Sequence, residues 1–169
     1  MQTPPRRASV SVRGSLNTSP ACDVSPRMDS RADAASVVLL EHELFVIVAE
    51  RRVVWCRVLT PPNVTPAAGA AAGKSAFAYL MTHVLVRRSS WLGVVADVRR
   101  GPSVAGPVTL QGLEQLFIHA EEVRKPLAML IGSAPAQREQ FVTLQRKAPR
   151  FTLVTPDPAS AVDWMTRAG

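Results

Sequence analysis

The sequence is poor in cysteine and aromatic residues and has no long apolar run, and each shortage excludes a class of protein. Its longest apolar stretches, such as LFVIVA and GVVADV, are far shorter than the roughly 18 residues a membrane span requires, so we expect no membrane span. Two cysteines, Cys22 and Cys56, make no disulfide framework, which indicates a reducing compartment, the cytoplasm. No set of Cys and His has zinc-ligand spacing, and we expect no cofactor.

Aromatic residues make up 5% of the chain although its net charge is +7. Nucleic-acid binding favours a continuous basic face with exposed aromatic residues. Three of the four basic pairs close predicted helices, where they complement the helix dipole, while Arg99-Arg100 follows a predicted strand. The charge is therefore divided between two ends of the predicted sheet. We expect no nucleic-acid partner, and instead a protein partner or self-association.

The first 36 residues differ in composition from the rest. They are rich in Pro, Ser and Arg and have no hydrophobic period, so they cannot bury enough apolar surface to offset the entropy of ordering. We predict a disordered tail over residues 1–36 and a single domain over 37–169.

Within the domain, strand and helix patterns alternate. The stretches 43–50 and 51–59 are rich in β-formers and abut, which indicates a hairpin. The segments that follow are predicted as a helix (71–86), a strand (91–98), a helix capped by Thr109, a strand (127–131), a helix opened by Ser133 and Pro135, a strand (150–154) and a helix opened by Asp157-Pro158. The predicted fold is α/β, in β-β-α-β-α-β-α-β-α order. It has a mixed, mostly parallel five-stranded sheet and about four helices.

The stretch AAGAAAGKSAFAYL, residues 67–80, superficially resembles a phosphate-binding loop. That loop needs four residues between its first glycine and Gly-Lys-Ser, whereas three separate Gly69 from Gly73. The motif must also leave a buried strand directly, and TPPNVTPAA intervenes here. We interpret the stretch as an Ala-rich lead-in to a helix, with a degenerate phosphate loop at 69–75 as the alternative.

Other catalytic patterns are weak. His42, His83 and His119 are isolated, and Ser133 lacks the strand-to-helix elbow of a nucleophilic serine. No paired carboxylates flank a pocket motif. We therefore expect no enzyme activity.

The loop RRGPSVAGPVT, residues 99–109, is the best candidate site. It follows a central strand, and open α/β sheets bind ligands beyond the carboxyl ends of their strands. Arg99 and Arg100 offer forked donors to a carboxylate or phosphate, and a helix N-terminus lies next to them. The predicted partner or anion site comprises Asp97, Arg99, Arg100, Ser103 and Thr109. The alternative is a plain connection whose arginines are solvated.

The element order, with its opening hairpin, the strand GVVADVR, the strand PLAMLIG and the closing DPASAVDWM helix, resembles the STAS family in its SpoIIAA-like branch. The resemblance covers roughly residues 43–167. It implies a non-catalytic regulatory module that acts through protein partners, and some relatives bind small or lipid-like ligands. The family's Asp-Ser-Ser-Gly phosphorylation motif would fall near Ala105-Gly106-Pro107, where no serine stands.

The sequence therefore predicts a STAS-like regulatory or protein-interaction module without the usual phosphorylatable serine. Two alternatives stay open: a nucleotide-binding protein that uses residues 69–75, and a carrier of a small or lipid-like ligand.

Overall fold

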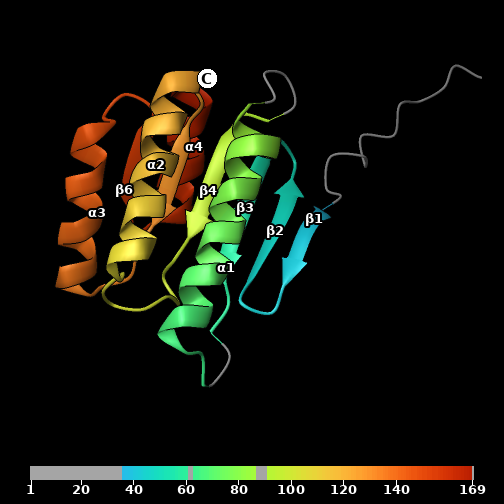
Figure 1. Cartoon of the computed structure of the whole chain (residues 1–169). Coiled ribbons are helices and arrows are strands. Elements are labelled where there is room, and N and C mark those ends of the chain that lie inside the picture. Colours follow the sequence, from blue (N-terminus) through green and yellow to red (C-terminus); the bar gives the residue numbers. More distant parts are fainter. Residues whose placement is uncertain (1–35, 61–62, 87–90, 169) are drawn as a thin grey trace, which may run out of the picture. The chain divides into compact units, whose positions relative to one another are not determined.

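The computed structural model describes residues 36–60, 63–86 and 91–168, which form an α/β unit (Figure 1). Within them no helix is both long and apolar enough to cross a bilayer. The strands are β1 (Ser36–His42), β2 (Phe45–Glu50), β3 (Val53–Val58), β4 (Gly93–Asp97), β5 (Leu127–Leu130) and β6 (Thr152–Thr155). The helices are α1 (Pro66–Tyr79), its π-helical continuation η2 (Leu80–Leu85), α2 (Pro107–Val123), α3 (Pro135–Lys147) and α4 (Pro158–Ala168).

The six described strands form one mixed sheet in chain order, from β1 to β6. The first three strands pair antiparallel and the last four pair parallel. Each parallel crossover steps to the next position in the same direction, so right-handed connections place α1, α2 and α3 on one face of the sheet. Figure 1 shows these three helices side by side. Helix α4 covers the opposite face, where Ala161 and Met165 pack with Val95 and Ala128.

The prediction of an α/β fold with a mixed sheet is confirmed, but the predicted count of five strands is wrong. The missed strand is β1, which begins at Ser36, one residue before the predicted domain boundary. Its pattern is hard to recognise because its register shifts between Val38 and Leu40, and because Val37 and Val38 are 53% and 57% exposed at the sheet edge. The predicted tail otherwise lies outside the described residues.

Two predicted helix starts are wrong. Helix α1 begins at Pro66 and not at residue 71, because Thr65 caps it by accepting a hydrogen bond from the Ala68 backbone N–H at 3.2 Å. Helix α2 begins at Pro107 with Gly106 at its N-cap, so Thr109 lies in its first turn and does not cap it. Helix α3 does begin at Pro135, as predicted, with Ala134 at its N-cap and Ser133 one residue before it.

The predicted cap of the last helix is confirmed. The carboxylate of Asp157 accepts hydrogen bonds from the backbone N–H groups of Ala159 and Ser160, at 3.3 and 2.9 Å. Pro158 follows at the first helical position.

The main core lies between the sheet and the layer of α1, α2 and α3. Helix α2 contributes Leu113, Leu116 and Phe117, which are at most 2% exposed. Each such side chain contributes about 1.5–3 kcal/mol through burial.

Candidate functional site

A large apolar cavity lies between α1, α2 and the carboxyl ends of β3 and β4. Its volume is about 780 Å³. Cys56 and Val58 of β3 and Ala96 of β4 line it from the sheet, and Leu113 of α2 and Phe141 of α3 line it from the helices. The position agrees with the general rule that open α/β sheets bind ligands beyond the carboxyl ends of their strands. We call this space the α1 cavity.

The α1 cavity exists because the inner side of α1 carries very small side chains. Gly69, Ala72, Gly73 and Ala76 all line it. Ala72 and Ala76 are 5% and 4% exposed, so they occupy core positions where most helices place Leu or Ile. Such small side chains fill less of the volume between α1 and the sheet, and a space remains.

Contacts along α1 keep the helix from collapsing into this space. A methyl group added to Gly112 of α2 would lie 2.8 Å from Cδ2 of Phe77, so the backbone of α2 and the ring of Phe77 are already in close contact. The hydroxyl of Tyr79 donates a hydrogen bond to the carbonyl oxygen of Leu39 at 3.3 Å, which ties the end of α1 to β1. The helix is thus held against a second helix and an edge strand.

The loop 98–106, which we call the roof loop, closes the cavity beyond β4. Pro102, Val104 and Ala105 line the space from this loop. Two glutamines of α3 hold it in place. The amide of Gln140 accepts a hydrogen bond from the Ala105 N–H at 2.9 Å and donates one to the Ala105 carbonyl at 3.3 Å.

Gln137, which is 3% exposed, holds the same loop at a second point. Its Nε2 donates to the carbonyl oxygens of Val98 and Pro102 at 3.3 and 3.2 Å, and its Oε1 accepts from the Gly132 N–H at 2.7 Å. A buried amide is stable only when its groups find partners. The roof loop is therefore a defined structure that is fastened by side-chain hydrogen bonds.

Among the described residues that line the α1 cavity, none is an acid, a lysine, an arginine or a histidine. Among the lining side chains, the thiol of Cys56 is the one whose chemistry most resembles that of a catalytic nucleophile. Burial raises its pKa to about 12, so it stays protonated near neutral pH and is a poor nucleophile. The cavity is suited to binding and lacks a general acid or base along its described walls.

The five predicted site residues lie on or next to the roof loop, but only Thr109 lines the cavity. Asp97 and Arg99 form a two-pronged ion pair, with Nε to Oδ1 at 2.9 Å and Nη2 to Oδ2 at 2.6 Å. The hydrogen bond from Arg99 holds the pKa of Asp97 below its ordinary value. Arg100 and Ser103 are exposed and do not line the cavity, whereas Thr109 lines it.

Residues 69–75 lie inside α1 and do not form a loop. The backbone N–H of Gly69 donates to the carbonyl oxygen of Thr65 at 3.0 Å, as an intrahelical N–H does. A phosphate-binding loop needs successive N–H groups that point at the phosphates. The resemblance of this stretch to a phosphate loop therefore has no structural basis.

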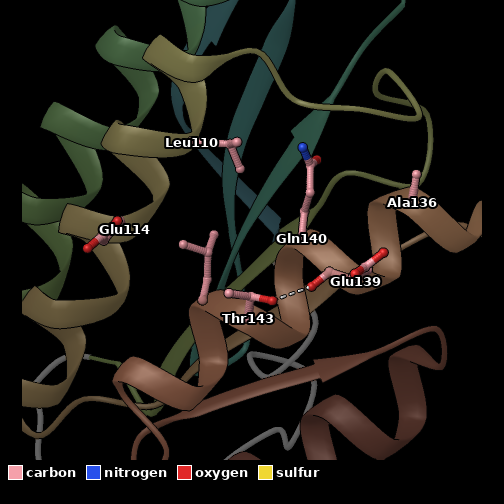
Figure 2. A pocket seen from close by; sticks show the side chains of 7 residues that line it. Leu110, Glu114, Ala136, Glu139, Gln140 and Thr143 are labelled. Carbon is pink, nitrogen blue, oxygen red and sulfur yellow. Dashed lines mark hydrogen bonds between the residues drawn. The ribbon is translucent and has the colours of Figure 1, made fainter.

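A second, smaller groove of about 480 Å³ lies between α2 and α3 (Figure 2). It has charged walls, with Glu114 on α2 and Glu139 on α3. Glu114 is paired with Lys147 at 2.7 Å. Figure 2 shows that Gln140, which fastens the roof loop, projects from α3 beside this groove. In the part of the chain that the structure describes, no cluster of three or more His, Cys, Asp or Glu could hold a metal ion.

Sequence reasoning and the α1 cavity point to the same edge of the sheet, but the sequence analysis did not identify the residues that form the cavity. The available signal was the Ala- and Gly-rich stretch itself, since small residues on the buried side of a helix leave space. No protein-family model matches the chain, and neither a curated protein nor a solved structure does.

Proposed function

We propose that the chain is a non-enzymatic, STAS-like regulatory module that binds a small molecule in the α1 cavity. The observation that supports this most strongly is the cavity itself. At about 780 Å³ it lies within the 300–1,000 Å³ typical of small-molecule sites, and most of its walls are apolar side chains. An apolar space of this size lowers packing density in the core, and contacts with a bound ligand would offset part of that cost.

The chemistry of the walls supports binding over catalysis. Catalytic sites combine perturbed titratable groups with an enclosed pocket. Among the described lining residues, only Cys56 has a shifted pKa, and the shift suppresses its reactivity. The order of the elements from β2 to α4, on which the resemblance to the STAS family rests, also supports the STAS-like interpretation.

In this proposal the roof loop couples ligand binding in the cavity to partner binding at the surface. Its inner side lines the cavity, while Arg100 and Ser103 are exposed on its outer side. A ligand that moves this loop changes the surface that a protein partner, or a second copy of the chain, would meet. A protein partner and a cytoplasmic setting are parts of this proposal.

Binding is tested with N-phenyl-1-naphthylamine, an uncharged fluorophore that brightens in apolar surroundings. Wild-type protein should bind it saturably. Ala72→Leu with Ala76→Leu places six carbons in the cavity and should weaken binding by at least about tenfold.

The matched control is Ala71→Leu with Ala78→Leu, which makes the same change on the exposed side of α1. Its affinity should equal that of wild type. Equal binding by all three proteins would place the probe elsewhere and refute the proposed site.

A further inference from the structure

We infer that the α1 cavity takes an uncharged, predominantly apolar molecule, and that it rejects ions of the same size. This inference rests on the proposed function and names the chemical class of the ligand. Three features of the cavity support it: the uncharged side chains of the interior, the hydroxyl groups at the edge and the apolar rim.

The side chains of the interior carry no charge that could compensate an ion. No described residue of the lining is ionised near neutral pH, and burying an isolated ion costs far more than burying a neutral group. The one buried amide, Gln137, already donates to Val98 and Pro102. No spare donor of this amide faces an anion.

Asp97 and Arg99, the charged residues on either side of the lining residue Val98, are paired with each other. Arg99 is held by both carboxylate oxygens of Asp97, and neither side chain lines the space. An anion that recruited Arg99 would have to break this pair. Breaking it would leave Asp97, whose side chain is 16% exposed, without its partner.

The rim of the cavity is apolar and yet exposed. Val64, Val104 and Val108 all line the space and are 38%, 52% and 61% exposed. They come from the β3–α1 connection, the roof loop and the first turn of α2 respectively. Exposed apolar residues that gather at one opening mark a binding site. A ligand that reaches the interior passes along these valines, which gain nothing from a charged group.

The polar side chains that remain at the edge of the cavity are hydroxyls. Thr60, Thr65 and Thr109 line it, and the Thr65 oxygen already accepts the Ala68 N–H. Hydroxyls can meet one neutral polar group, such as an alcohol or a carbonyl. The ligand class is therefore a neutral lipid-like compound with at most a small uncharged head.

The test is displacement of N-phenyl-1-naphthylamine at pH 8 by three ten-carbon compounds that differ only in the head group. Decan-1-ol is neutral, decanoate is ionised because carboxyl groups titrate near pH 4, and decylammonium is a cation. We expect decan-1-ol to displace the probe with at least about tenfold higher affinity than either ion.

A rim variant tests the same point from the protein side. Val108→Lys places an ammonium group at the mouth on an exposed position, with Val108→Gln as its neutral control. The ratio of decanoate affinity to decan-1-ol affinity should be several-fold higher in Val108→Lys than in Val108→Gln, because only the lysine variant places a positive charge beside the carboxylate.

The outcomes separate the two proposals. Decanoate or decylammonium binding as tightly as decan-1-ol, with binding lost in the filled variant Ala72→Leu with Ala76→Leu, overturns the ligand class and leaves the proposed function standing. Absence of saturable probe binding, or binding unchanged in the filled variant, refutes the proposed function and this inference together.

Discussion

Helices α1 and α2 cover neighbouring strands on the same face of the same sheet, yet they pack in opposite ways. Helix α2 turns Leu113, Leu116 and Phe117 toward the sheet and fills the space beneath it. Helix α1 turns Ala72 and Ala76 toward the sheet and leaves about 780 Å³ beside it. The difference arises from side-chain volume, because both helices belong to one layer of one core.

Under the proposed function, one layer of the core serves stability through α2 and ligand binding through α1. Interiors are normally packed as densely as organic crystals, so a large apolar space in a core is an exception that needs a cause. Here the cause is a run of Ala and Gly on a helix that is braced by Phe77 and Tyr79. The α2 side is packed with large apolar side chains, and the α1 side lines the cavity that we propose as the binding site.

The largest expected effect is a loss of stability when a buried side chain of α2 is truncated. Phe117→Ala removes a ring that is 0% exposed and should lower the free energy of unfolding by about 3–5 kcal/mol. Urea denaturation followed by circular dichroism measures this change. A loss below about 1 kcal/mol would mean that the α2 side is loosely packed too, and the contrast between the helices would disappear.

A smaller gain in stability is expected when the cavity beside α1 is filled. Without ligand, Ala72→Leu with Ala76→Leu should raise the free energy of unfolding by about 0.5–2 kcal/mol, because the added carbons fill existing space. The control pair Ala71→Leu with Ala78→Leu should stay within about 0.5 kcal/mol of wild type. If the filled variant instead loses stability, the leucines are overpacked and the space beneath α1 is smaller than the structure indicates.

The smallest effect concerns the ion pair at the base of the roof loop. Because the hydrogen bond from Arg99 lowers the pKa of Asp97 below its ordinary 3.8, the pair stabilises the fold above that pH. This stabilisation is lost as the pH falls through the lowered pKa. Arg99 is 42% exposed, so solvent screening limits the contribution to less than about 1 kcal/mol.

Asp97→Asn should therefore show a weaker loss of stability below about pH 4 than wild type does. Urea midpoints at pH 7 and at pH 3 measure the difference. Identical acid dependence in the two proteins would show that the pair does not contribute.

The sequence predicted those parts of the fold that have strong local signals. The apolar runs of β2, β3, β4 and β5 and the Asp157 cap of α4 were all recognisable. Strand β1 was not, because its bulge and exposed edge disrupt the alternation of apolar residues. The start of α1 was missed because Ala and Gly give no amphipathic period.

Only the approximate location of the candidate site, and not its lining residues, could be predicted from the sequence. The rule for open α/β sheets led to the loop 99–109, which overlaps the roof of the cavity. The walls come from α1, β3, α2 and α3, which are far apart in the sequence, and a space between them depends on tertiary packing. Sequence reasoning favoured the arginines because the charge of a residue can be read directly from the sequence. A cavity left by small side chains cannot, because it depends on how distant elements pack.

The most direct test of the central claim is a methyl NMR titration of the full chain with decan-1-ol. The methyl resonances of Ala72, Ala76 and Ala96, which line the cavity, should shift saturably, while those of the solvent-facing Ala71 and Ala78 should not. Saturable shifts confined to other methyl groups, or none at all, would contradict the account.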